Sequence, residues 1–272
     1  MKKLLARAAF AISPKKVTER ALKTLSFPGI GRMRDFEKTA LDGARKSTRT
    51  FGKFTIAEYH WGFGPRRALL IHGWEGRAAN FAALVPILVD AGFTVTAFDA
   101  PAHGESTRSE TTLFDFGKLV TEYLREQRYE LFITHSFGSV PLSFALQQVR
   151  SYPVKNMFLI TSPNRFSDRV HQVVNQLNFP PKLAEKLLDE FSSRFNVNPR
   201  VLSVAELGKH IAPLKTLMVH GIDDKVLPIE WSRQVAEKWQ NVELVELEDT
   251  GHYRILWDQR TQELLHRLVT SL

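Results

Sequence analysis

Beyond Thr50, the sequence alternates between short apolar runs and longer stretches in which apolar residues recur at helical spacing. Continuously apolar runs of this kind are typical of parallel strands that are buried on both faces. The expected strands are residues 51–59, 68–72, 94–98, 131–134, 157–160, 216–219 and 242–247, and the expected helices are 78–90, 113–125, 140–149, 229–238 and 255–269. This order predicts an α/β fold with one mostly parallel sheet flanked by helices.

One interval breaks the alternation. More than fifty residues separate the strand ending near Thr161 from the one beginning near Lys215, whereas most strand-helix loops have two to six residues. Residues 166–177 and 181–195 have the apolar spacing of helices, so we expect residues 162–213 to form a helical cap, or lid, inserted after the sixth strand and placed over the edge of the sheet. The apolar face of the cap comprises Phe166, Val170, Val173, Val174, Leu177, Phe179, Leu183, Leu187, Leu188, Phe191 and Phe195.

Composition excludes several classes of protein. The chain has 272 residues, 43% hydrophobic and 24% charged, which is typical of a water-soluble globular protein. It has no cysteine, so disulfides, zinc-thiolate sites and a cysteine nucleophile are excluded. No run of 18 apolar residues is present, so we expect no transmembrane helix.

The net charge of +8 is confined to the N-terminus. Residues 1–49 hold 13 Lys and Arg against four acids, a net charge of +9, so the remaining 223 residues carry −1 in total. We expect two short basic helices here, the second starting after Ser13 with Pro14 in its first turn and ending before Phe27. Arg7 interrupts the first apolar stretch where a signal peptide would be unbroken, so we expect a cytoplasmic protein.

A serine follows the apolar run 131–134, in the sequence Thr134-His135-Ser136-Phe137-Gly138, and a helical stretch comes next. A sharp strand-to-helix turn exposes a serine hydroxyl above the sheet, and this arrangement is the nucleophile elbow Gly-x-Ser-x-Gly. Thr134 replaces the first glycine, whose small size lets strand and helix approach. The pentapeptide alone fits equally well a buried serine that caps a helix.

A serine nucleophile needs a base, and the base needs a partner that fixes its tautomer. Asp223 and Asp224 follow the strand at 216–219, and His252 lies in a loop after the strand at 242–247. Asp224 lies 88 residues after Ser136, and His252 lies 28 residues after Asp224. All of these positions follow the carboxyl ends of expected parallel strands, where open α/β sheets bind ligands.

Residues 50–272 resemble the α/β-hydrolase superfamily, and in particular its esterase-like and lipase-like serine hydrolases. Two further segments carry this resemblance: His72-Gly73-Trp74 and the loop Asp99-Ala100-Pro101-Ala102-His103-Gly104-Glu105-Ser106. The resemblance implies Ser136 as nucleophile, His252 as general base and Asp224 as the acid that orients His252, with Asp223 as the alternative. It also implies an oxyanion hole made by the backbone N–H groups of Trp74 and Phe137. The implied organisation is a basic N-terminal segment at 1–49, a hydrolase core at 50–161 and 214–272, and the cap at 162–213.

The expected activity is hydrolysis of a carboxylic ester or related acyl compound, with a small apolar molecule as substrate and no cofactor. A thioesterase, acyltransferase or peptidase would use the same acyl-enzyme, and a non-catalytic ligand-binding protein is the alternative from another class. We expect no metal, because no His-x-His or His-Glu-x-x-His spacing is present; His72, His103, His135 and His220 are expected to brace loops, as is Asp99.

The basic N-terminus leaves two interpretations open. Residues 1–28 could attach weakly to an anionic membrane surface, since each basic residue there contributes about 1 kcal/mol. Alternatively, its apolar residues pack on the hydrolase core; these are Leu4, Leu5, Ala8, Ile12, Val17, Ala21, Leu22 and Leu25. We expect no nucleic-acid binding, because interleaved aromatic residues and a recognisable binding module are missing.

Overall fold

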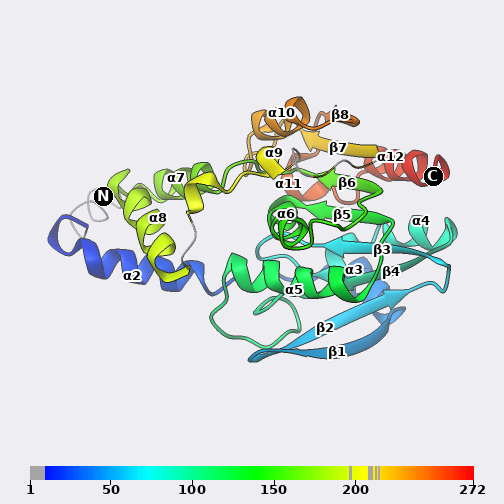
Figure 1. Cartoon of the computed structure of the whole chain (residues 1–272), viewed down its shortest axis with the longest axis horizontal. Helices are drawn as coiled ribbons and strands as arrows, with labels where there is room; N and C mark the ends of the chain where they lie inside the picture. Colours follow the sequence, from blue (N-terminus) through cyan, green and yellow to red (C-terminus); the bar gives the residue numbers. More distant parts are fainter. Residues whose placement is uncertain (1–9, 196–197, 208–210, 212, 214) are drawn as a thin grey trace.

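The computed structural model describes residues 10–195, 198–207, 211, 213 and 215–272. In this part of the chain, eight strands form one sheet in the order β1-β2-β4-β3-β5-β6-β7-β8 (Figure 1). The strands are β1 (Arg45–Phe51), β2 (Phe54–Trp61), β3 (Arg66–Ile71), β4 (Phe93–Phe98), β5 (Leu131–His135), β6 (Asn156–Ile160), β7 (Lys215–Gly221) and β8 (Val242–Leu247). β2 is antiparallel to both of its neighbours, and all pairs from β4 to β8 are parallel. The predicted α/β class with a mostly parallel sheet is confirmed.

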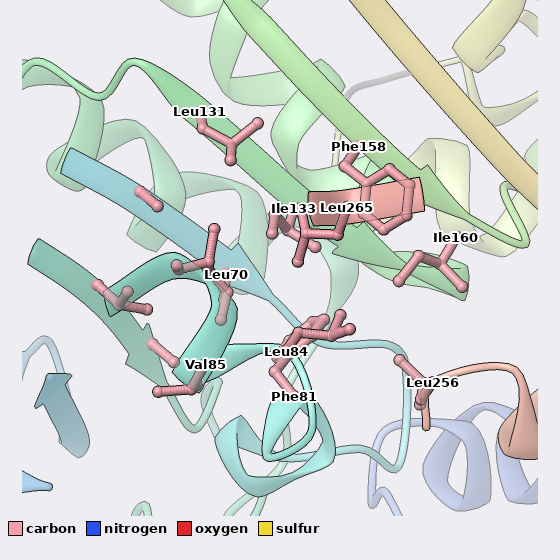
Figure 2. Packing of buried hydrophobic residues seen from close by; sticks show 14 of the residues in the cluster. Leu70, Phe81, Leu84, Val85, Leu131, Ile133, Phe158, Ile160, Leu256 and Leu265 are labelled. Carbon is pink, nitrogen blue, oxygen red and sulfur yellow. The ribbon is translucent and has the colours of Figure 1, made fainter. Parts of the chain in front are cut away.

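Helices cover both faces of the sheet. They are α2 (Pro14–Leu25), α3 (Asp35–Asp42), α4 (Val85–Asp90), α5 (Leu113–Glu126), α6 (Ser139–Gln148), α7 (Phe166–Gln176), α8 (Lys182–Phe195), α9 (Val204–Leu207), α10 (Ile229–Lys238), α11 (Gly251–Arg254) and α12 (Gln259–Thr270), with the 3₁₀ helices η1 (Ala78–Phe81), η2 (Ser136–Gly138) and η3 (Pro199–Val201). On one face, side chains of β3, β5 and β6 meet those of η1, α4 and α12 (Figure 2). On the other face, α5, α6, α9 and α10 close a second core.

Three details of the sequence prediction are wrong. The strand expected at 51–59 is the hairpin β1–β2, which turns at Gly52 and Lys53, so the sheet begins at Arg45, before the boundary expected at residue 50. The helix expected at 78–90 is divided into η1 and α4, and the helix expected at 255–269 is α12, which begins four residues later, at Gln259. Helix α3 was not expected; the Glu37 carboxylate accepts a hydrogen bond from the Arg34 N–H at 2.7 Å, which caps its first turn.

The segment after β6 is helical, as expected for an insertion after the sixth strand. Figure 1 shows its helices α7 and α8 together with α2 at one end of the molecule, with the sheet at the other. The N-terminal helix α2 packs on α8 through a small apolar cluster that includes Leu22, Val174 and Leu187. Thus Leu22, with Val17 and Ala21 beside it, packs on the cap.

Leu4, Leu5 and Ala8 lie outside the described residues. Among the described helices, none is both long enough and apolar enough to cross a bilayer.

Candidate active site

Ser136 lies at the turn from β5 into η2 and α6, at the carboxyl edge of the sheet. Its φ of 52° lies in the left-handed region, which is strained for a residue with a side chain. Two glycines make room for this turn. A Cβ on Gly138 would lie 2.1 Å from the Ile71 carbonyl oxygen, and one on Gly73 would lie 3.0 Å from the Ser136 Cβ. The backbone therefore has the sharp turn expected of the elbow.

Thr134 occupies the first position of the elbow and is fully buried. It pairs with Ile71 of β3 and Leu159 of β6 in the parallel ladder. Its hydroxyl oxygen has no hydrogen-bond partner among the described residues. The strand thus accommodates the larger side chain at the cost of an unsatisfied buried hydroxyl.

Asp224 and His252 are hydrogen-bonded to each other. The His252 Nδ1 lies 2.7 Å from the Asp224 Oδ2, and the side chains are 5% and 0% exposed. The other oxygen of Asp224 accepts hydrogen bonds from the N–H groups of Val226 and Leu227, at 2.7 and 2.9 Å. Burial acts to raise the pKa of Asp224, but hydrogen bonds from His220 and His252 outweigh it and hold that pKa well below its usual value. Asp224 is therefore a buried carboxylate that fixes the tautomer of His252.

Asp223, the other acid considered from the sequence, has a different set of contacts. Its Oδ1 accepts hydrogen bonds from the N–H groups of Thr250 and Gly251, at 3.1 and 3.0 Å. Both bonds lower the pKa of Asp223, and the bond from Gly251 has the larger effect. Asp223 thus braces the loop that leads into His252, while Asp224 contacts the imidazole.

Two neighbouring histidines support this pair. The buried His135 Nε2 lies 2.9 Å from the His252 carbonyl oxygen, and burial lowers the pKa of His135 to about 3, so its neutral ring can donate this bond. His220 lies 2.7 Å from the Ser232 hydroxyl through Nδ1, while its Nε2 is 3.5 Å from Asp224. Both side chains hold the loops that carry Asp224 and His252.

His72 and His103 brace the loops after β3 and β4. The His72 Nδ1 lies 2.7 Å from the Gly73 carbonyl oxygen, and its Nε2 accepts a hydrogen bond from the Ala100 N–H. The His103 Nδ1 lies 2.9 Å from the Pro101 carbonyl oxygen, and burial lowers the pKa of His103 to about 4. Both rings are neutral at pH 7 and hold backbone groups.

Asp99 also stabilises its own loop. The carboxylate accepts hydrogen bonds from the N–H groups of Ala78 and Glu105 and from the Tyr59 hydroxyl. Within the described residues, no group of three or more His, Asp or Glu side chains is arranged to hold a metal ion.

Trp74 and Phe137 are neighbours at the elbow. Trp74 follows β3, and its ring meets the Phe137 ring edge-on at 5.4 Å between centroids. Phe137 lies in the first turn after Ser136, where backbone N–H groups have no acceptor within the helix. For the Trp74 N–H, no acceptor is found in the described part of the chain. Both N–H groups are therefore available to a ligand.

A cavity of about 230 Å³ joins these residues. Ser136, His252, Trp74 and Phe137 line its core side. The opposite wall is apolar and comes from the cap and from α2; it comprises Leu22, Leu25, Phe166, Val170, Val173, Val174, Leu187 and Phe191. No hydrogen bond between Ser136 and His252 is found among the described residues, and such bonds are often long until substrate binds.

Some lining residues were not expected from the sequence. Glu75, Arg169 and Tyr253 place polar groups at the cavity, and Leu22 and Leu25 bring the N-terminal helix into its wall. Tyr253 could have been found, since it directly follows His252. The contribution of α2 depends on packing between segments far apart in the chain, which no local pattern reports.

Comparison with known proteins identifies the family of the fold. The family model described as "Alpha/beta hydrolase family" matches residues 68–267. No curated protein matches the sequence. Among solved structures, lip1 of Acinetobacter baumannii AYE, a presumptive lipase, has a TM-score of 0.64 at 19% identity over 89% of this chain and 98% of its own.

Two further structures resemble the chain. Est1E of Butyrivibrio proteoclasticus, solved with ferulic acid, has a TM-score of 0.63 at 17% identity over 83% of this chain and 96% of its own. A bacterial membrane phospholipase A has a TM-score of 0.64 at 15% identity over 97% of this chain and 96% of its own. At these identities the likeness concerns the fold.

Proposed function

Because the chain belongs to the α/β-hydrolase family, we propose that it is a serine hydrolase that cleaves a carboxylic ester through an acyl-enzyme on Ser136. The observation that carries the proposal is the 2.7 Å hydrogen bond between His252 and Asp224, in the same cavity as a serine on a strained turn. A hydroxyl of ordinary pKa is a weak nucleophile without such a base beside it.

In the acylation step, the Ser136 oxygen attacks the ester carbonyl and His252 Nε2 takes its proton. Asp224 keeps the proton of the free imidazole on Nδ1, so that Nε2 can accept, and it stabilises the imidazolium that forms. His252 then gives its proton to the departing alcohol. A water molecule, deprotonated by His252, releases the acid and restores Ser136.

The negative charge that develops on the carbonyl oxygen is the second requirement of the reaction. The backbone N–H groups of Trp74 and Phe137 are the proposed oxyanion hole, because both residues line the cavity with Ser136 and neither N–H has an acceptor among the described residues. One such donor is typically worth about 10²–10³ in rate.

The cap wall indicates the part of the substrate that is not cleaved. Its lining is mostly apolar, which favours an acyl or alcohol group with a hydrocarbon surface. An oxygen ester and a thioester form the same acyl-enzyme, so assays with the two leaving groups on one acyl chain would rank these activities.

The direct test replaces Ser136 with alanine. The wild-type protein should hydrolyse p-nitrophenyl acetate, and Ser136→Ala should lower kcat by about 10⁴-fold or more, because the covalent route is removed. The variant's far-ultraviolet circular dichroism and melting temperature control for folding. Undiminished turnover by the folded variant would overturn the proposal, and a wild-type protein that retains acyl ligands without cleaving them would instead favour a binding protein.

A further inference from the structure

Helix α2 has two chemically different faces. Thr18 and Leu22 are buried on the side that packs against the cap. Lys16, Arg20 and Lys23 recur at the helical spacing i, i+4 and i+7, and all three are exposed. This spacing places them together on the side away from Leu22. We refer to these three residues as the basic face of α2.

The charges of the basic face are not neutralised by the rest of the described chain. Among the described residues, none of the three side chains forms an ion pair, and the first turn of α2 contains no acid. Glu19 is the single acidic residue of the helix. A row of unpaired cations attracts a polyanion or an anionic surface.

Exposed apolar side chains flank the basic face at both ends of the helix. Ile12 is 84% exposed before α2 begins, and Phe27 and Ile30 are 40% and 52% exposed after it ends. Large apolar residues next to cations are typical of segments that lie in a membrane interface. A nucleic acid would use the cations but not the aliphatic side chains, so the combination favours lipid.

The same helix forms part of the cavity wall. Leu22 and Leu25 line the cavity, as does Ser26, whose carbonyl oxygen accepts a hydrogen bond from the Thr111 N–H at 2.9 Å. The exposed Phe27 follows directly. A surface that also holds Phe27 would therefore lie next to Ser26, a lining residue of the cavity that contains Ser136.

We propose that the basic face of α2, together with Ile12, Phe27 and Ile30, binds bilayers of anionic lipid, and that the ester cleaved at Ser136 comes from that bilayer. The binding of the bilayer by α2 is independent of catalysis. The claim that the cleaved ester comes from the bilayer rests on the proposed function.

The expected size of the effect follows from the charges. A basic residue near an anionic membrane contributes about 1 kcal/mol, which corresponds to about a fivefold change in the partition coefficient. Removing all three charges should therefore weaken binding by about 100-fold. At 1 M salt, surface charges are screened over about 3 Å, so high salt should also weaken the binding of the wild-type protein to anionic membranes.

The binding test is sedimentation of the full chain with vesicles of phosphatidylglycerol and phosphatidylcholine, and with vesicles of phosphatidylcholine alone. The wild type should bind the anionic vesicles, and the triple variant K16Q/R20Q/K23Q should bind about 100-fold less. The matched control R67Q/R125Q/R150Q removes the same charge from exposed arginines at the opposite edge of the sheet, and it should bind like the wild type.

Failure of the wild type to bind anionic vesicles, or equal losses in the two triple variants, would overturn the proposal. Tighter binding to a 20-base-pair DNA duplex than to the vesicles would also overturn it, in favour of a nucleic acid. The apolar part is tested by I12N/F27N, which should lower binding to the anionic vesicles while leaving the number of charges unchanged.

Activity measurements separate this proposal from the proposed function. K16Q/R20Q/K23Q should hydrolyse soluble p-nitrophenyl acetate like the wild type, but should lose most activity on a fluorogenic ester embedded in anionic vesicles. Equal activity of this variant and the wild type on the embedded ester would refute delivery from the bilayer. If Ser136→Ala retained esterase activity while K16Q/R20Q/K23Q lost vesicle binding, the proposed function would be wrong but the proposed membrane-binding surface would be supported.

Discussion

The two walls of the cavity are built in different ways. On the core side, buried hydrogen bonds join Asp224 to the Val226 N–H, His135 to the His252 carbonyl oxygen, and His252 to Asp224. On the cap side, apolar side chains from three helices meet in a small cluster, with Leu22 of α2 packed among cap residues. Directional hydrogen bonds thus fix the residues proposed for bond cleavage, while the other wall is shaped mainly by apolar packing.

The first prediction tests whether the core wall depends on one carboxylate. Asp224→Asn should lower kcat by about 10⁴-fold, because an amide cannot hold the tautomer or stabilise the imidazolium. Asp223→Asn is the matched control and should cost less than about tenfold, since its side-chain oxygen can still accept from Thr250 and Gly251. Steady-state kinetics with one ester measures both. Equal losses in the two variants would show that Asp224 has no role in catalysis that Asp223 lacks.

The second prediction concerns the cap wall. Val170→Ala/Val173→Ala enlarges the apolar side of the cavity and should shift the preference between short and long acyl chains by about tenfold or more, since one methylene in an apolar pocket is worth 10–200-fold. Leu177→Ala, on the end of the same helix and 59% exposed, should leave the preference unchanged. The readout is kcat/KM across a series of p-nitrophenyl esters. A large fall in kcat for every ester would mean that the cap wall also affects the cleavage step and does not act on chain-length preference alone.

The third prediction concerns pH. Because the folded-state pKa of Asp224 lies below its ordinary value, its carboxylate stabilises the fold above about pH 4, and this contribution is lost as pH falls through the lowered pKa. Asp224→Asn should be less stable than the wild type by about 1–3 kcal/mol at pH 7, and the gap should narrow toward pH 2. Denaturant unfolding at several pH values measures this gap. A gap independent of pH would contradict the buried, hydrogen-bonded carboxylate.

The smallest effect is expected at Thr134. Its buried hydroxyl has no partner among the described residues, so Thr134→Val should keep the shape of the side chain and raise the free energy of unfolding by up to about 1 kcal/mol. Activity should stay within a few-fold of wild type. A marked loss of stability would show that the hydroxyl is bonded after all, and a marked gain in activity would show that Thr134 distorts the elbow.

The sequence predicted the core wall well. The strand-helix order fixed the sheet, and the positions of Ser136, Asp224 and His252 after strand ends predicted that they would meet at one edge. These are local patterns combined with a topological rule.

The prediction was weaker where distant contacts decide the structure. The hairpin at Gly52 was not recognised, because alternation continues through the turn. The bond between His135 and His252 joins residues 117 positions apart. The docking of α2 on the cap likewise brings Leu22 beside Val174, which helical spacing within either segment cannot indicate.

Ser136 is the proposed nucleophile on the core side of the cavity. The most direct measurement is intact-protein and peptide mass spectrometry after treatment of the folded chain with a fluorophosphonate probe. The wild-type protein should carry one adduct per chain, located on Ser136, and Ser136→Ala should carry none. A folded wild-type protein that takes no label, or that is labelled at another residue, would show that Ser136 is not the nucleophile.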